Sequence, residues 1–195
     1  MTSIQEAGGR VNAGHVTILM SGGIDSAATV AACRGLYASK SGLFVDYGQP
    51  AGRSEWEAVL RIAQHFSLDT ARLDVGLKMS SRQGEYFGRN ALLLLAAASS
   101  SEVRPLSIAL GIHSMCPYYD TTPLFVRDMQ RLLDGYSGGE IGLTAPFLSH
   151  TKAEVIRYAK NVGIPLELTY SCEVQDAPPC GQCPSCRDRR EFETD

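Results

Sequence analysis

Short apolar runs alternate with helical segments about five times between residues 15 and 165, and this alternation constrains the fold more than any other feature. The runs are rich in β-branched side chains, as expected of strands buried on both faces. When strands and helices alternate with short connections, each helix crosses over the sheet in a right-handed sense and the next strand runs parallel to the last. We therefore expect an α/β fold with a five-stranded, parallel, doubly wound sheet. Ligands of such sheets bind at the carboxyl ends of the strands. The predicted strands are His15–Met20, Leu43–Val45, Thr70–Val75, Leu106–Leu110 and Ile141–Thr144.

The segments between these runs show helical spacing of apolar residues. The first predicted helix spans residues 26–36, and the stretch from Leu92 to Ala98 is apolar all round, which predicts a buried helix. Thr151 and Glu154 form a capping box at the start of the last predicted helix, which stops at Gly163. The side chains expected to face the sheet are Trp56, Val59, Leu60 and Ala63; Phe125, Met129, Leu132, Leu133 and Tyr136; and Val155, Ile156, Ala159 and Val162.

The length of 195 residues suits one domain, and 44% hydrophobic and 20% charged residues are globular values that exclude disorder and coiled coil. We divide the chain into a loose leader at 1–14, an α/β domain at 15–165 and a small appendage at 166–195. A net charge of −3 argues against a dedicated nucleic-acid binder. The longest apolar run, Ala91–Ala98, is far shorter than a membrane span, so we expect a cytoplasmic protein without a membrane partner.

A glycine-rich hexapeptide follows the first predicted strand and opens the first helix. Its backbone N–H groups would converge on the positive end of a helix dipole, where phosphate binds well. The aspartate would cap the helix or hold Mg²⁺; alternatively, the peptide is only a tight turn. The Walker lysine and the GxGxxG pattern are both absent, which argues against GTPases and nicotinamide enzymes. The residues in question are Ser21, Gly22, Gly23, Asp25 and Ser26.

Four of the six cysteines lie within fifteen residues, at Cys172, Cys180, Cys183 and Cys186. Four thiolates at this spacing suit a tetrahedral zinc ion, and a site with no open position is structural rather than catalytic. An iron–sulfur cluster is the competing interpretation, and disulfides are the least favoured in a cytoplasmic chain. Cys33 is expected in the core.

The SGGIDS peptide resembles the signature of the PP-loop ATP pyrophosphatases, which bind the pyrophosphate of ATP and cleave ATP to AMP. From about Val16 to Phe192 the chain is also similar to the 7-cyano-7-deazaguanine synthase family. The further matching pieces, in the same order as in that family, are VDYGQ at 45–49, GRN at 88–90, YD at 119–120, TKAE at 151–154 and CGQCPSCRDRR at 180–190.

The resemblance implies that ATP adenylates 7-carboxy-7-deazaguanine, with release of pyrophosphate, and that an amine then attacks the acyl-adenylate. In the family ammonia gives an amide, which is adenylated again and dehydrated to the nitrile. The implied cofactors are ATP, Mg²⁺ and a structural Zn²⁺. Orientation and charge stabilisation would be the main contributions of the protein.

Carried over to this chain, the resemblance implies that Lys152 reaches the phosphates and that Arg89 binds phosphate or the substrate carboxylate. Asn90, Tyr119 and Asp120 would contact the substrate, with Asp120 suited to a guanine-like amine edge. The alternatives are a solvated lysine, a surface arginine at a helix start, and a helix cap at Asp120.

The segment from 76 to 88 is short where the synthases have a long cover over the substrate. This departure motivates a second hypothesis, in which the acyl group passes to a protein amine, as is implied for synthase-like relatives in bacterial antiphage operons. A tRNA thiolation enzyme that uses Cys116, beside His113, is a third hypothesis, and a non-catalytic ATP- and zinc-binding module is a fourth. The sequence leaves the oligomeric state open, with a homodimer as one option.

Overall fold

The computed structural model describes residues 14–82, 85–114 and 116–193. Its centre is a five-stranded parallel sheet in the order β3-β2-β1-β6-β7. The predicted leader, apart from Gly14, lies outside the described residues. The expected parallel sheet is confirmed. The strands are β1 (His15–Leu19), β2 (Ser39–Asp46), β3 (Thr70–Asp74), β6 (Leu106–Ala109) and β7 (Ile141–Thr144).

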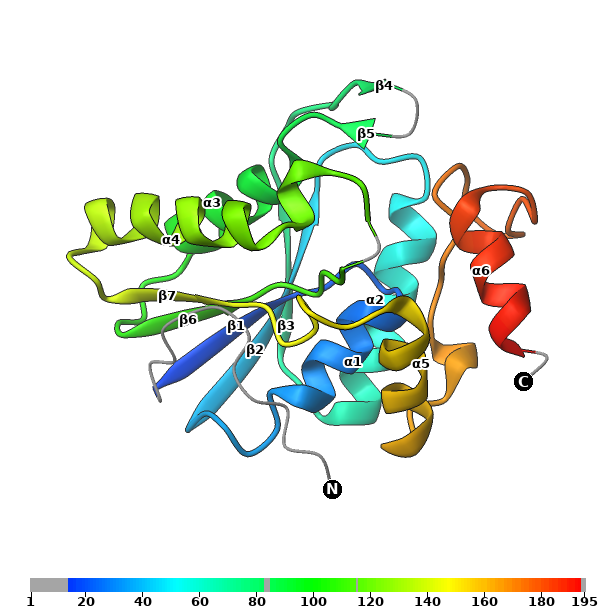
Figure 1. Ribbon diagram of the computed structural model, residues 1–195, viewed down its shortest axis with the longest axis horizontal. Coiled ribbons are helices and arrows are strands. Elements are labelled where there is room, and N and C mark those ends of the chain that lie inside the picture. Colours follow the sequence, from blue (N-terminus) through cyan, green and yellow to red (C-terminus); the bar gives the residue numbers. More distant parts are fainter. Residues whose placement is uncertain (1–13, 83–84, 115, 194–195) are drawn as a thin grey trace.

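Helices cover both faces of this sheet (Figure 1). One face carries α1 (Ile24–Ala32), α2 (Gly52–Phe66) and α5 (Lys152–Asn161), and the other carries α3 (Arg89–Ser100) and α4 (Pro123–Ser137). Alternate strand residues point into the two layers: Phe44 packs with the first set of helices, whereas its neighbours Leu43 and Val45 pack with the second. The doubly wound architecture is therefore confirmed.

Four side chains that we expected to face the sheet are exposed instead. Leu60 is 47% exposed, Leu132 41%, Tyr136 82% and Val162 45%. On α2 the buried strip runs through residues 58, 59, 62 and 63, which turns Leu60 outward. Val162 is the residue after the last turn of α5, where the helical spacing no longer applies. The stripe predictions were wrong at these positions because each helix buries a narrower strip than its apolar spacing indicates.

Helix α3 is less buried than its apolar sequence predicts. Only Leu94, Ala97 and Ala98 of the stretch from 92 to 98 are buried, and the others are partly exposed. The helix packs on one face of the sheet through a single strip of side chains, so the side chains on its opposite side reach the surface.

Two elements escaped sequence analysis. The segment from 76 to 88 holds a short antiparallel hairpin of β4 (Ser81–Arg82) and β5 (Glu85–Tyr86). The C-terminal segment ends in helix α6 (Pro184–Glu193). The polar sequence of α6 has no apolar periodicity, because this helix packs on a cysteine cluster rather than on the main core.

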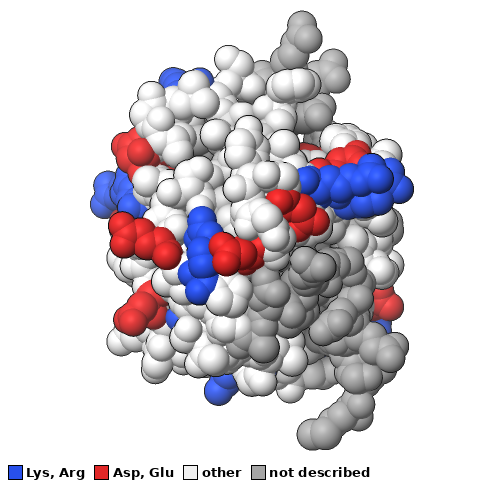
Figure 2. Space-filling view, turned by 90° about the vertical axis from the view of Figure 1, so that its left-hand side faces the viewer, with Lys and Arg blue, Asp and Glu red and all other residues white. Residues whose placement is uncertain are grey.

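Surface charges are mixed on the face formed by the α3 and α4 end of the molecule, where Lys and Arg alternate with Asp and Glu (Figure 2). Among the described residues, no helix combines the length and the apolar character that crossing a membrane requires.

Candidate active site

The loop between β1 and α1 lies against the first turn of α2, and this contact requires glycine at position 22. Gly22 has φ +76°, and a Cβ there would come within 2.5 Å of the Glu55 carbonyl oxygen and 2.9 Å of the Ala58 Cβ. Gly111, which follows β6, packs against the start of α1 beside this loop, since a Cβ there would lie 3.0 Å from the Asp25 carbonyl oxygen. The loop is thus held from two sides, with its backbone at the N-terminus of α1.

The hydroxyl groups of the loop differ in their surroundings. Ser26 is buried, and its Oγ donates to the Gly23 carbonyl oxygen at 2.9 Å. Ser21 is exposed at the surface of the loop, and its Oγ lies 3.5 Å from the Gly23 nitrogen. Ser21 is therefore the hydroxyl that remains accessible to a ligand.

Lys152 and Asp25 form an ion pair beside this loop. The Lys152 Nζ donates to both carboxylate oxygens, at 2.6 and 2.7 Å, and both side chains are about three-quarters buried, with exposures of 22% and 26%. Lys152 is the first residue of α5, where the predicted capping box of Thr151 and Glu154 is confirmed. Asp25 lies in the first turn of α1 but makes no capping hydrogen bond, because Gly23 is the N-cap. The structure therefore brings together two charged groups that lie 127 residues apart in the chain.

A cavity of about 260 Å³ opens at this edge of the sheet. Ser21, Gly23, Asp25, Ser26 and Lys152 line one end, and Arg89 and Asn90 line another part. Apolar side chains at or near the strand ends also line it, namely Leu19, Leu43, Val45, Leu110 and Ile112. The cavity therefore combines a glycine-containing loop at a helix N-terminus, two cationic side chains and apolar lining residues. Small-molecule sites commonly combine apolar walls with a few polar groups in this way.

The same cavity is lined by a polar cluster around Glu55, a residue that the sequence analysis did not identify. The Gln49 amide donates to a carboxylate oxygen of Glu55 at 2.9 Å, and its own oxygen accepts from the Tyr47 backbone nitrogen at 2.9 Å. Burial raises the pKa of Glu55 to about 7, although Gln49 and Arg89 act in the opposite direction. The signal that could have found Glu55 is its position in the first helical turn after VDYGQ, at the ligand-binding edge of the sheet.

The charge of Arg89 is supported from several sides. Burial disfavours the guanidinium, but Tyr47, Asp120 and Glu55 outweigh that effect and raise the pKa of Arg89 above its ordinary value. Burial also raises the pKa of Tyr47 to about 12, so this phenol stays neutral. Arg89 is therefore a permanent cation in the wall of the cavity.

Asn90 and Asp120 hold each other across two elements. The Asn90 amide nitrogen Nδ2 donates to the Asp120 carbonyl oxygen at 2.9 Å, and the Asp120 carboxylate accepts from the Asn90 backbone N–H at 3.2 Å. Asp120 thus caps α3 rather than its own helix, whereas Thr122 caps α4. Asn90 lines the cavity and Asp120 does not.

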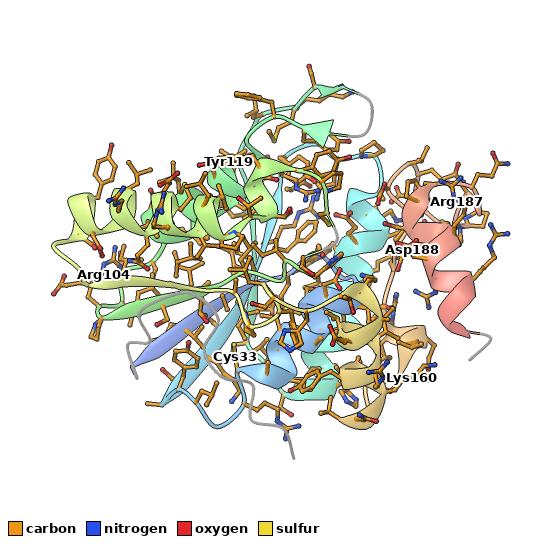
Figure 3. The ribbon with its side chains drawn as sticks, viewed as in Figure 1. Cys33, Arg104, Tyr119, Lys160, Arg187 and Asp188 are labelled. Atoms are coloured by element: carbon orange, nitrogen blue, oxygen red, sulfur yellow. The ribbon has the colours of Figure 1, made fainter. Side chains whose placement is uncertain are left out.

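Tyr119 lies in a short 3-10 turn (Tyr119–Thr121) just before α4, away from α6 (Figure 3). It is 54% exposed, and its hydroxyl donates to Asp128 at 2.9 Å. Like Asp120, it is not among the residues that line the cavity.

The two remaining thiols are separate from the cysteine cluster. Cys33 is buried in the core, as expected. The Cys116 Sγ lies 3.7 Å from the His113 Nε2, and burial raises the pKa of this thiol and lowers the pKa of the imidazole. Neither residue lines the cavity. A thiol with a raised pKa is a weak nucleophile near neutral pH.

The four clustered cysteines converge on one point, with their sulfur atoms all within 4.8 Å of one another. The Sγ atoms of Cys180 and Cys186 are 4.0 Å apart, close to the spacing of about 3.8 Å that four Zn–S bonds of about 2.3 Å impose in a tetrahedron. Burial opposes ionisation of Cys172, but N–H donors from Cys180 and the following turn outweigh it and lower the pKa to about 6. The donor set therefore fits a tetrahedral thiolate metal centre.

The C-terminal segment that carries this cluster docks on the loop and on α2. The Tyr170 N–H donates to the Gly22 carbonyl oxygen at 2.9 Å. The Ser54 N–H donates to Asp176 at 2.9 Å, and the Ala177 N–H donates to the Ser54 Oγ at 2.8 Å. Asp188 lies on the side of α6 that faces α2 (Figure 3) and lines the cavity. The segment thus supplies one wall of the site.

Comparison with known proteins identifies relatives of this chain. Residues 85–193 match the family model described as "Queuosine biosynthesis protein QueC". A 7-cyano-7-deazaguanine synthase from Prochlorococcus marinus (strain NATL2A) is 33% identical, covering 90% of this chain and 91% of the relative. A synthase from Sulfurihydrogenibium sp. (strain YO3AOP1) is 27% identical and covers 91% and 93%. The Prochlorococcus alignment spans 208 positions, more than this chain contains, so that relative carries residues that this chain lacks.

Solved structures share the fold at low sequence identity. The U34-tRNA thiolase NcsA from Methanococcus maripaludis, solved with its [4Fe-4S] cluster, has a TM-score of 0.53 and 16% identity; the match covers 92% of this chain and 64% of the thiolase. The NMN synthetase from Francisella tularensis has a TM-score of 0.51 and 14% identity, over 85% of this chain and 70% of that protein. These similarities concern the fold alone.

Proposed function

This chain belongs to the family of the queuosine biosynthesis protein QueC, and from that membership we propose that it converts 7-carboxy-7-deazaguanine into 7-cyano-7-deazaguanine with ATP and ammonia. Its curated relatives are named for this synthesis, an ATP-dependent ligation that forms carbon–nitrogen bonds. The observation that carries the proposal is the single cavity that joins the β1–α1 loop and Lys152 to Arg89 and Asn90.

The phosphates of ATP would bind at the β1–α1 loop. Backbone N–H groups at the N-terminus of α1 and the Ser21 hydroxyl are suited to donate to them, and the tight contact of Gly22 with α2 holds this backbone in place. Lys152 would stabilise the negative charge that develops as pyrophosphate leaves. Since Asp25 already holds the Lys152 ammonium in place, this cation is positioned before the reaction starts.

Arg89 would bind the carboxylate of the deazaguanine through its planar fork. Asn90 lines the same wall, and its hydrogen bonds with Asp120 fix its orientation. Asp120 and Tyr119 would then act by positioning α3 and the loop before α4, and direct contact of these two residues with the substrate requires a movement of that loop.

Two metals belong to the proposal. Mg²⁺ would neutralise charge on the triphosphate, and Asp25 is the carboxylate of the loop suited to hold it. Zn²⁺ would be held by Cys172, Cys180, Cys183 and Cys186, where it stabilises the wall formed by the C-terminal segment. Free thiols arranged as metal ligands suit the reducing cytoplasm, where we place the protein.

A second candidate function rests on the short segment between β3 and α3. The described residues of that segment include a short hairpin of two two-residue strands, β4 and β5, and the Prochlorococcus relative has additional residues in the aligned region. A less covered site leaves room for a larger acceptor, so the acyl group could pass to a protein amine in a defence system. The adenylation step would be the same in both cases.

Mass spectrometry of products separates these possibilities. The protein is incubated with ATP, 7-carboxy-7-deazaguanine and ammonium, and we expect AMP, pyrophosphate and the nitrile. Release of pyrophosphate without amide or nitrile, with the acid found as its acyl-adenylate or regenerated by hydrolysis of that adenylate, would contradict the synthase proposal and support a protein acceptor. Absence of pyrophosphate release would contradict both and favour a binding module, whereas sulfur transfer to tRNA that Cys116→Ala abolishes would favour thiolation.

A further inference from the structure

The partly buried carboxyl of Glu55 has no role in the proposed binding of ATP, yet it lines the cavity. It extends from the first turn of α2, whose backbone touches Gly22 of the β1–α1 loop. Arg89, which lines the wall proposed for the substrate carboxylate, lines the same cavity and is near enough for its charge to act on Glu55. A carboxyl group that shares the cavity with both proposed sites is placed to serve the carbon that would become adenylated.

From this placement we infer that Glu55 is the proton acceptor for the attacking amine, an inference that rests on the proposed function. An amine that attacks the acyl-adenylate forms a C–N bond, the C–O bond to AMP breaks, and its electron pair leaves on the phosphate oxygen. One N–H bond also breaks, and the Glu55 carboxylate takes that proton. Conversion of the amide to the nitrile releases two further protons and needs a base at the same place.

The other carboxyl groups that line the cavity are less suited to this task. Asp25 is bound to the Lys152 ammonium through both oxygens. Glu173 accepts a hydrogen bond from the Ser185 hydroxyl, and Asp188 is exposed on α6. Glu55, in contrast, is partly buried and accepts a hydrogen bond from a neutral group, the Gln49 amide.

The hydrogen bonds of Glu55 orient it and leave capacity for a substrate. Gln49 donates to Oε2 at 2.9 Å, and the Gln49 side chain is itself fixed by the Tyr47 backbone N–H. Gln49 is therefore a positioning residue, because its amide sets the orientation of the Glu55 carboxylate. A base held in this way needs no reorganisation before it accepts a proton.

The charges around Glu55 agree with proton transfer near neutral pH. Burial raises its pKa to about 7, Gln49 and Arg89 lower it, and Asp46 and Asp176 raise it. Tyr47 and Tyr86 also face it, but burial raises the pKa of both phenols, which keeps them neutral. A base whose pKa is close to the working pH is both ionised and able to hold a proton.

The test compares Glu55→Gln with Glu57→Gln, a matched control on the same helix whose carboxylate is exposed and pairs with Arg53. Glutamine keeps the size of glutamic acid and an oxygen for Gln49, so the fold should tolerate it. Hydroxylamine serves as the acceptor because its conjugate acid is far more acidic than ammonium, and rates are compared at a fixed concentration of its unprotonated form, so that its own titration does not mask that of the enzyme. We expect hydroxamate formation to fall about 100-fold or more in Glu55→Gln, with ATP–pyrophosphate exchange changed less than about threefold and no effect in Glu57→Gln.

The pH dependence supplies a readout that a merely structural role would not move. For the wild type, hydroxamate formation should rise with an inflection near pH 7 and then level off. Glu55→Gln should lose this inflection, and Glu55→Asp should retain one at a lower rate. Equal loss of exchange and hydroxamate formation, or an unchanged inflection in Glu55→Gln, would overturn the assignment of Glu55 alone. Absence of any hydroxamate with the wild type would overturn the proposed function and this inference together.

Discussion

The β1–α1 loop and the C-terminal segment line the same cavity, but they are held in place by different means. The loop is anchored by the packed sheet, with Gly22 against α2 and Gly111 against the start of α1. The segment from 170 to 193 has a core of four cysteines and Tyr170 instead of an apolar core. One wall of the site therefore depends on hydrophobic packing, and the other on a cluster of four cysteines arranged as metal ligands.

Loss of the metal should therefore produce the largest change, and only in one wall. In Cys183→Ser we expect bound zinc to be lost and backbone protection from hydrogen exchange to disappear between 170 and 193, because structural zinc contributes about 10 kcal/mol or more to folding. Metal analysis and exchange mass spectrometry check this. Cys116→Ser, outside the cluster, should keep its zinc, and simultaneous loss of protection in β1 and β6 would break the comparison.

On the loop side, Lys152→Met should reduce pyrophosphate release about 10²- to 10³-fold, because it removes the cation that is held ready by Asp25. The control is Lys160→Met in the last turn of the same helix (Figure 3), for which we expect no change in rate. A Lys152→Met enzyme with full activity would mean that this ion pair is only structural.

The packing of the loop itself is tested by Gly22→Ala. The added Cβ meets the Glu55 carbonyl oxygen at 2.5 Å in a left-handed conformation, so we expect loss of ATP binding and a drop of about 2–4 kcal/mol in the free energy of unfolding. Gly163→Ala has a similar φ of +75° but open space around it, and it should cost about 1 kcal/mol with ATP affinity intact. Denaturant titration and calorimetric ATP binding measure both effects.

These outcomes show how far the sequence could predict this molecule. The five strands, the β1–α1 loop and the cysteine cluster follow from local patterns, since each is specified by residues that lie close together in the chain. The pairing of Lys152 with Asp25 and the placement of Glu55 beside Arg89 depend on which helix follows which strand end, so spacing alone could not reveal them. Leu60 and Tyr136 were wrongly predicted to face the sheet. Apolar periodicity indicates which face of a helix is buried, but not how wide the strip in contact with the sheet is.

The smallest effect concerns the link between the two walls. Asp176→Ala removes the acceptor for the Ser54 N–H in the first turn of α2, a hydrogen bond worth about 1 kcal/mol. We expect faster hydrogen exchange in the C-terminal segment with zinc retained, and a modest rise in KM for the deazaguanine substrate. Asp69→Ala, remote from this contact, is the control; equal effects of both substitutions would show that the link does not matter.

Adenylation of the substrate carboxylate at this cavity is the central step of the proposed function. ATP–pyrophosphate exchange measures this step independently of the acceptor. We predict exchange that requires 7-carboxy-7-deazaguanine, is lost in Lys152→Met and persists in Glu55→Gln. Exchange that is absent, or that proceeds equally without the deazaguanine carboxylate, would contradict adenylation of this substrate at the cavity.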